Sequence, residues 1–164
     1  MRDYLHRSAL LLHSAYMRIS QQARDAISSG FDLAYNGQGK PVQVRVISKR
    51  QRIPLRFLEQ IFQRLRKAGV IEGKRGPGGG YVLSHKPEDI SLLTVLEAVE
   101  GRIASESELG QAKDSRVDFR PRFVWGLMTN SLRSSLEQIT IESLVRRAAR
   151  EAVPRSEPGS MYFI

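Results

Sequence analysis

The sequence predicts a mainly α-helical protein with one small β-hairpin and a long C-terminal helix. In several segments, apolar residues recur every three or four positions between Gly, Pro and Asn residues, which is typical of amphipathic helices. A glycine-rich turn, Gly76-Pro77-Gly78-Gly79-Gly80, lies between the apolar runs Val70-Ile71 and Tyr81-Val82-Leu83. Two such runs joined by a tight turn indicate a β-hairpin.

Composition limits the classes of protein that the chain can belong to. Its 164 residues are 41% hydrophobic and 26% charged, as in one globular domain or a small domain with an appendage. The absence of cysteine excludes disulfides, thiolate zinc sites and a cysteine-held iron–sulfur cluster, and three scattered histidines are too few for a three-histidine metal site. Because no apolar run approaches the about 20 residues of a membrane-spanning helix, we expect a soluble, cytoplasmic protein. We also expect no cofactor.

Positive charge is concentrated in one part of the chain. The formal net charge is +9, but residues 17–86 hold fourteen Lys and Arg against four Asp and Glu, whereas residues 87–164 hold ten against twelve. A basic segment joined to a slightly acidic one indicates that the first binds a polyanion and that the second has another task. The alternative is a solvated charged surface without a partner.

The first elements are a helix and an ambiguous segment. Ser20 can cap a helix that residues 36–41 end, because this stretch contains Asn, Gly and Pro. In residues 42–51, alternating valines favour a strand, although Val44 and Ile47 also fit one face of a helix. Periodicity alone therefore favours the strand here.

The next helix is the most strongly patterned element of the first half. Pro54 suits a first helical position and Gly69 suits a left-handed end. The apolar stripe between them consists of Leu55, Leu58, Ile61, Phe62 and Leu65. The opposite side is polar and mostly basic, with Arg56, Glu59, Gln60, Gln63 and Lys67 on it and Arg64 and Arg66 on its flanks.

After the hairpin the pattern becomes helical again. Ser91 can cap a helix that Gly101 ends. Residues 102–120 are rich in Ser, Glu, Asp and Gly, and we assign them to a loop. Pro121 then opens a long amphipathic helix, and Thr140 can cap a last helix.

The polar side of the helix that follows Pro54 is suited to DNA. The major groove admits one helix, and Arg, Lys, Gln, Asn and Glu recognise base edges there. Arg75 stands beside a two-strand loop thin enough to follow a minor groove with the arginine inserted. The candidate DNA-binding residues are therefore Arg56, Glu59, Gln60, Gln63, Arg64, Lys67, Arg75, Pro77 and Gly78.

A nucleotide-binding loop and a catalytic site are both poorly supported by the sequence. The glycines lack the spacing of a phosphate-binding loop, no Gly-Lys-Ser/Thr follows, and a strand comes next instead of a helix. Nothing marks His85 as a general base, and we expect no enzyme. DNA binding fits better, although every surface helix has a polar side and residue spacing alone is a weak indicator of it.

The helix from Pro121 presents an apolar stripe that needs a surface to cover it. The stripe consists of Val124, Leu127, Met128, Leu132 and Leu136, and it packs either within its own chain or on a second subunit. A second subunit is the simpler partner for a helix that lies beyond a compact unit. Two-fold pairing would place two reading helices about 34 Å apart on one side of DNA.

Four short segments carry a family resemblance. They are IPLRFLEQIF at 53–62, LRKAG at 65–69, RGPGGGY at 75–81 and LEAVEG at 96–101. These segments resemble the Rrf2 family of bacterial winged-helix transcription regulators, which has IscR-like, NsrR-like and CymR-like members. The resemblance begins at Met17. Residues 1–16 are therefore either an N-terminal extension or the result of a misassigned start, in which case Met17 is the native initiator.

The resemblance implies a division of the remaining chain. Residues 17–101 form a winged helix-turn-helix domain that binds DNA, 102–120 a loop, 121–153 a dimerisation helix and a terminal helix, and 154–164 a flexible tail. It implies a homodimer whose helix after Pro54 enters the major groove, with Glu59 and Gln60 touching bases and Arg75 near the minor groove. It also favours a helix over a strand for about residues 43–51.

The chain departs from the family pattern where some members have a sensor. Members that sense iron or nitric oxide carry three cysteines in the loop that corresponds to residues 107–119, where this chain has none. Arg122 matches the position of a cluster-ligating histidine. In addition, Asp25 replaces an aromatic residue and Arg52 replaces a turn glycine. A cluster held in the family's manner is therefore excluded.

The function expected from the sequence is sequence-specific DNA binding by a homodimeric transcriptional regulator, a repressor without an iron–sulfur cluster. Its signal would be a small-molecule effector or a regulatory partner protein, and the sequence does not choose between them. The alternative is a winged-helix adaptor that binds proteins and does not read DNA.

Overall fold

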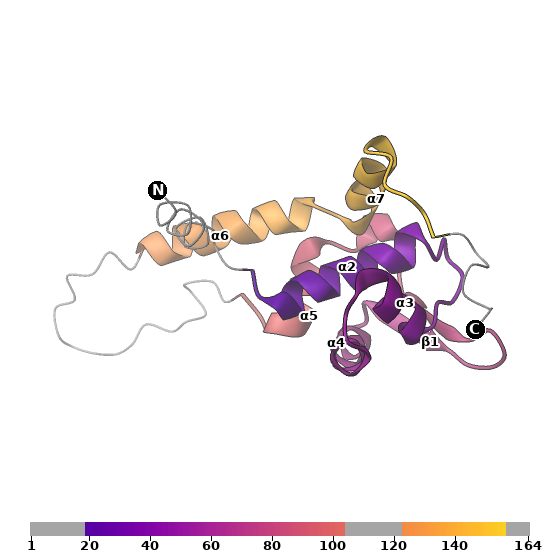
Figure 1. Ribbon diagram of the computed structural model, residues 1–164. Helices are drawn as coiled ribbons and strands as arrows, with labels where there is room; N and C mark the ends of the chain where they lie inside the picture. The colour runs from indigo at the N-terminus through magenta and orange to yellow at the C-terminus, as the bar shows by residue number, and fades with distance from the viewer. Residues whose placement is uncertain (1–18, 104–122, 157–164) are drawn as a thin grey trace, which may run out of the picture.

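The computed structural model describes residues 19–103 and 123–156, which form helices and one two-stranded sheet (Figure 1). The elements are α2 (Gln21–Tyr35), α3 (Val44–Gln51), α4 (Leu55–Lys67), β1 (Ile71–Lys74), β2 (Gly80–Leu83), the 3-10 helix η1 (Pro87–Asp89), α5 (Leu92–Glu100), α6 (Phe123–Gln138) and α7 (Ile141–Arg150). The predicted mainly helical fold with one hairpin is confirmed. None of the described helices combines the length and the apolar composition that crossing a membrane requires.

Three helices begin at the hydroxyl side chains predicted as caps. Ser20, Ser91 and Thr140 each accept a hydrogen bond from the backbone N–H three residues later, at 3.0, 3.1 and 3.2 Å. These bonds satisfy donors that the first turn of a helix leaves without an intrahelical partner. The start of α2, α5 and α7 is thus determined by local chemistry.

The ambiguous residues 42–51 divide between the two conformations. Val42 forms an antiparallel bridge with Tyr81, each donating its N–H to the carbonyl oxygen of the other, at 2.9 and 2.8 Å. From Val44 the chain is helical, and Ile47 is fully buried in the core. The helix expected over about 43–51 is therefore confirmed, and strand pairing is limited to Val42.

The helix α4 packs its apolar stripe into the core of the domain. Its buried residues are Leu58, Ile61, Phe62 and Leu65. The ring of Phe62 meets Tyr81 edge-on, with ring centroids 4.9 Å apart. Pro54 stands one position before the first helical residue, and the helix ends just before Gly69, whose φ of +74° suits glycine.

The hairpin β1–β2 is the wing of the domain, and β2 is bonded near the turn of the hairpin to Val42, which precedes α3. The strands pair antiparallel with Lys74 opposite Gly80. A Cβ on Gly80 would lie 2.5 Å from the carbonyl carbon and oxygen of Val42, and one on Gly79 would lie 2.4 Å from the carbonyl oxygen of Lys74. Only glycine fits at these two positions, so the turn composition follows from close backbone approach.

The helix α6 extends beyond the folded unit, and α7 returns the chain to it (Figure 1). The turn between them pairs with the segment that enters α5: Leu92 donates its N–H to the carbonyl oxygen of Ile139 at 2.8 Å, and Ile141 donates to that of Ile90 at 2.9 Å. Ile141 is fully buried. Most of the loop predicted for 102–120, and the predicted helix start at Pro121, lie outside the described residues.

The chain after α7 lies against the end of α2. The hydroxyl of Tyr35 donates to the carbonyl oxygen of Val153 at 2.7 Å, and the guanidinium of Arg155 lies 4.6 Å from the centre of the Tyr35 ring. The backbone N–H of Ser156 donates to Asn36 Oδ1 at 2.9 Å. Residues 154–156, expected to begin a flexible tail, therefore belong to the fold, because a cation–π contact and hydrogen bonds hold this stretch to α2. The N-terminal extension and residues 157–164 lie outside the described residues.

Candidate DNA-binding surface

Five of the predicted DNA-binding residues share the exposed side of α4. They are Arg56, Glu59, Gln60, Gln63 and Lys67, and all are exposed. Because a helix turns about 100° per residue, all of them except Glu59 form one continuous row opposite the buried stripe. No hydrogen bond or ion pair within the described residues holds these side chains. We refer to Arg56, Gln60, Gln63 and Lys67 as the reading row.

Arg64 is placed differently from the reading row. Its Nη1 donates to the carbonyl oxygen of Val99 in the last turn of α5, at 2.7 Å, and Gln22 Nε2 donates to the same oxygen. These bonds satisfy a carbonyl group that the end of a helix leaves without an intrahelical partner. Arg64 therefore joins α4 to α5, and we do not include it in the DNA-binding surface proposed below.

The tip of the wing presents the other three predicted residues. Arg75, Pro77 and Gly78 are all exposed. Along β1, Lys74 Nζ pairs with Glu72 Oε1 at 2.7 Å, whereas the described residues offer Arg75 no such partner. Because Tyr81, close to this end of the wing, is bonded to Val42, the turn that carries Arg75 is joined to the segment that leads into α3.

A buried ion pair holds α3 against α2. The carboxylate of Asp32 is completely buried, and its Oδ2 lies 2.8 Å from Arg50 Nη2. Its Oδ1 accepts from Asn36 Nδ2 at 2.9 Å and from Gln51 Nε2 at 3.0 Å. Sequence reasoning missed this contact, although an acidic residue next to Leu33 on the apolar side of α2 was a signal for it. The pair positions the helix that precedes α4.

Basic side chains extend the positive surface from α4 onto α3. Residues 44–67 contain eight Lys and Arg and a single acidic residue, Glu59. Arg45 and Lys49 are exposed on α3, and exposed Arg52 ends that helix in a left-handed conformation with φ of 54°. These three residues were not among the predicted DNA-binding residues. Arg45 and Lys49 lie in the segment that was ambiguous in sequence, and Arg52 was noted only as the replacement of a turn glycine. Exposed basic side chains therefore lie on α3 as well as on α4, and positive charge of this kind is suited to a polyanion.

Most of the stripe predicted for dimerisation is exposed on α6. Leu127 and Met128 are 62% and 59% exposed, Leu132 is 37% exposed and Val124 is half-buried. The neighbouring aromatic residues Phe123 and Trp125 are 64% and 62% exposed. Exposed apolar side chains gathered on one helix are typical of an interaction site.

Leu136 differs from the rest of this stripe. It is partly buried and packs against the core of its own chain. It lies near the end of α6 that joins α7, where the helix meets the folded unit (Figure 1). Leu136 therefore packs within its own chain, and we do not include it in the subunit contact proposed below.

Contacts of Arg133 fix α6 relative to α5. Its Nη1 pairs with Glu97 Oε1 and donates to the carbonyl oxygen of Ile103 at 2.7 Å. The backbone N–H of Ile103 donates to the same Glu97 oxygen at 3.1 Å. The direction of α6 is therefore set by charged and polar contacts at the end of α5.

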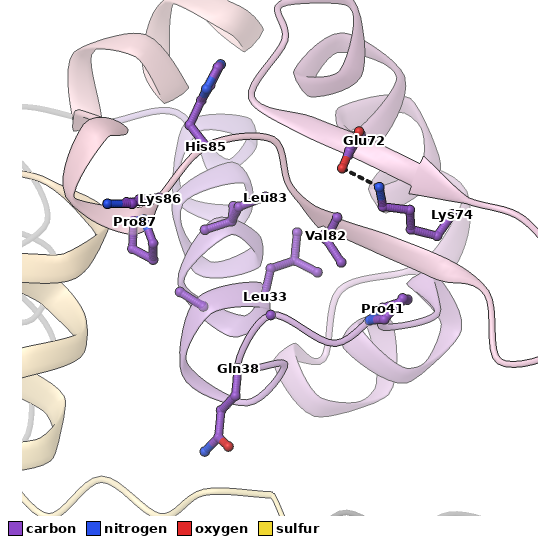
Figure 2. A pocket seen from close by; sticks show the side chains of 12 residues that line it. Leu33, Gln38, Pro41, Glu72, Lys74, Val82, Leu83, His85, Lys86 and Pro87 are labelled. Atoms are coloured by element: carbon purple, nitrogen blue, oxygen red, sulfur yellow. Dashed lines mark ion pairs between the residues drawn. The ribbon is translucent and has the colours of Figure 1, made fainter.

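A pocket lies between the strands of the wing, the end of α2 and the segment that follows α2 (Figure 2). Val82 and Leu83 of β2 and Leu33 of α2 give it an apolar floor, and the Lys74–Glu72 ion pair stands at its edge. His85 also lines it. None of these side chains was predicted as a site residue, and the pocket offers no cluster of catalytic groups.

Comparison with known proteins decides the family. Residues 19–147, which contain α2 to α5, the wing, α6 and part of α7, match the Rrf2 family model, described as an iron-dependent transcriptional regulator. The chain belongs to the Rrf2 family. The predicted family and its DNA-binding winged-helix fold are thereby confirmed.

Relatives and solved structures of the Rrf2 family cover most of the chain. The HTH-type transcriptional regulator IscR of Photobacterium profundum is 36% identical over 131 residues, which is 79% of this chain and 76% of that protein. The structure of T. potens IscR has a TM-score of 0.67 and 30% identity, covering 90% of this chain and 97% of that one. The structure of CymR, the global cysteine regulator of B. subtilis, has a TM-score of 0.66 and 26% identity, covering 80% and 98%.

The donor groups of this Rrf2 chain do not fit an iron–sulfur cluster. The chain has no cysteine to supply thiolate ligands. Among the described residues, no three His, Asp or Glu side chains gather where they could hold a metal ion. Residues 107–119 and Arg122, which correspond to the ligand positions of cluster-binding members, lie outside the described residues. We therefore assign no role in DNA binding or its regulation to an iron–sulfur cluster.

Proposed function

We propose that this protein is a homodimeric, sequence-specific DNA-binding transcriptional repressor that works without an iron–sulfur cluster. The observation that carries this proposal is the reading row of α4, exposed and unpaired within the described residues, with Arg75 presented on the adjoining wing. A protein that occupies both grooves of a promoter excludes other proteins from it, and repression by occlusion follows.

The side chains of the reading row match the chemistry of base edges in the major groove. Arg56 suits the two acceptors of guanine, and Gln60 and Gln63 suit the donor and acceptor of adenine. Glu59 can accept from the amino group of cytosine. Lys67, at the end of α4, suits a phosphate group. On the wing, Arg75 reaches the minor groove, where arginine is favoured by the negative potential.

A homodimer places two reading rows on one DNA duplex. The exposed apolar side of α6, which includes Leu127, Met128 and Trp125, is the proposed contact between the subunits. A two-fold contact through one helix is self-complementary, since the same residues face each other. The dimer then binds two half-sites about one helical turn apart.

The signal that controls binding is proposed to be a small-molecule effector or a regulatory partner protein. The family description names iron, but this chain offers no cysteine for a cluster. A ligand or partner regulates binding if it has different affinities for a conformation that binds DNA and one that does not. An enzymatic activity is not part of the proposal.

Selection of bound fragments from the source genome, followed by affinity measurements on the recovered sites, tests the function. If the protein neutralises six or more phosphates, its affinity for DNA is expected to fall by about 10³-fold or more between about 50 and 200 mM salt. Gln60→Ala is expected to cost about 1–3 kcal/mol and to relax the preference at one base pair. Lys67→Ala is expected to weaken binding to all sites uniformly.

Arg147→Ala is the matched control for the loss of one positive charge. Arg147 is exposed on α7 and pairs with Glu151 on its own helix, at 2.8 Å. Figure 1 shows α7 on the opposite side of the folded unit from α4. This variant is expected to keep full affinity. Absence of salt-sensitive DNA binding would refute the proposal, and partner binding that is independent of Gln60 and Arg75 would instead favour the adaptor.

A further inference from the structure

Phe57 places an apolar ring on the otherwise polar exposed side of α4. Its side chain is 61% exposed, and it is the single exposed large hydrophobic residue within residues 20–103. Isolated apolar residues are common on protein surfaces. The position of this one is informative, because its backbone N–H donates to the carbonyl oxygen of Pro54 at 3.0 Å, which places it in the first turn of the helix.

The neighbours of Phe57 are residues of the reading row. Arg56 precedes it, and Gln60 follows three positions later, where side chains on a helix stand about 5–6 Å apart at Cβ. In helix-turn-helix proteins the N-terminal residues of the second helix contact base edges. If α4 enters the major groove as proposed above, Phe57 reaches the same base pairs as Arg56 and Gln60.

The chemistry of the major groove identifies what a phenyl ring can contact there. Guanine, adenine and cytosine present hydrogen-bond donors and acceptors in the major groove. A phenyl ring that covers these groups removes their hydration and offers no hydrogen bond in return. Thymine alone presents an apolar group, its C5 methyl. We propose that Phe57 packs on the C5 methyl of one thymine in each half-site and so makes the regulator require thymine at that position. This inference rests on the proposed function.

Replacing thymine with deoxyuridine tests the contact, because deoxyuridine lacks only the C5 methyl. A site recovered by genomic selection is synthesised with each thymine replaced in turn, and the full chain is titrated against each duplex. Burying one methyl group contributes about 0.8 kcal/mol, which is about a fourfold change in affinity. The wild-type chain is expected to lose about fourfold at one thymine of each half-site.

Three variants separate the methyl contact from other losses. Phe57→Gln is expected to bind the thymine and deoxyuridine duplexes equally well, whereas Phe57→Leu keeps part of the difference. Lys67→Ala is the control that weakens binding to both duplexes and keeps their ratio. Because Phe57 is exposed, Phe57→Gln is expected to leave the thermal unfolding midpoint unchanged, which excludes misfolding as the cause.

The outcomes distinguish this inference from the proposed function. If every thymine can be replaced without loss, or if Phe57→Gln keeps the wild-type ratio, the inference is overturned while DNA binding stands. Unchanged affinity for the deoxyuridine duplexes is the result expected if Phe57 instead contacts the sugar–phosphate backbone or a protein partner. If the wild-type chain binds no DNA, the proposed function fails and the inference fails with it.

Discussion

Replacing Asp32 with alanine is expected to destabilise the protein far more than the loss of an ordinary surface ion pair. The Asp32 carboxylate is fully buried, and the Arg50 side chain that pairs with it is only 14% exposed. Asn36 and Gln51 donate to the other carboxylate oxygen. Alanine leaves the Arg50 charge buried without a counter-charge and leaves both amides without their acceptor.

The magnitude follows from a comparison within the same chain. Removing one partner of a buried ion pair costs about 3–5 kcal/mol. The pair between Glu72 and Lys74 has nearly the same length, 2.7 Å against 2.8 Å, but its side chains are 50% and 51% exposed. An exposed pair contributes about 0–1 kcal/mol. Asp32→Ala is therefore expected to cost at least about 2 kcal/mol more than Glu72→Ala.

The free energy of unfolding of both variants is measured by urea titration monitored by circular dichroism and extrapolated linearly to zero urea. The double variant Asp32→Leu with Arg50→Met is expected to recover most of the loss, because apolar replacement of both partners removes the unpaired charge. A loss below about 1 kcal/mol for Asp32→Ala, or equal losses for it and Glu72→Ala, would refute the reasoning.

Three further variants test other parts of the structure. Gly80→Ala is expected to lower the free energy of unfolding by about 1–3 kcal/mol in urea titrations, since its Cβ would lie 2.5 Å from the backbone of Val42; an unchanged midpoint would contradict the close approach. Arg52→Gly is expected to raise the free energy of unfolding by about 0.5–1 kcal/mol. The left-handed conformation costs a non-glycine residue about 1–2 kcal/mol, and the greater flexibility of glycine in the unfolded chain offsets part of this gain. Thermal unfolding measures the change, and a lower unfolding midpoint would contradict the prediction. Leu127→Glu combined with Met128→Glu is expected to produce a monomer in sedimentation experiments and to weaken operator binding by about tenfold or more, whereas a variant that remains dimeric would move the subunit contact away from α6.

Local chemistry made the ends of helices predictable. Ser20, Ser91 and Thr140 accept bonds from N–H groups only three residues away, so their role as caps depends on no distant part of the chain. Gly69 likewise follows α4 with the left-handed backbone that glycine favours. The exposed side of α4 was predictable for a related reason, since the spacing of its buried residues determines which side chains face away.

Features that depend on distant neighbours were not predictable from the pattern. The valines at the start of residues 42–51 alternate as in a strand, yet only Val42 finds a partner strand, because Ile47 fills the core as part of a helix. The sequence predicted that Arg64 contacts DNA, whereas in the structure Arg64 donates a hydrogen bond to a carbonyl oxygen at the end of α5. Leu136 continued the apolar stripe of α6, but it lies where that helix meets its own domain.

The last turn of α5 is contacted by α4, the proposed DNA-reading helix, and by α6, the proposed dimerisation helix. Arg64 of α4 bonds to Val99, and Arg133 of α6 pairs with Glu97 two residues earlier. In the proposed dimer this makes α5 a rigid spacer, so the protein determines the separation of the two α4 helices. One extra base pair between half-sites moves a half-site by about 3.4 Å and turns it by about 34–36°. We therefore expect the proposed dimer to select operators by the spacing of their half-sites as well as by their bases.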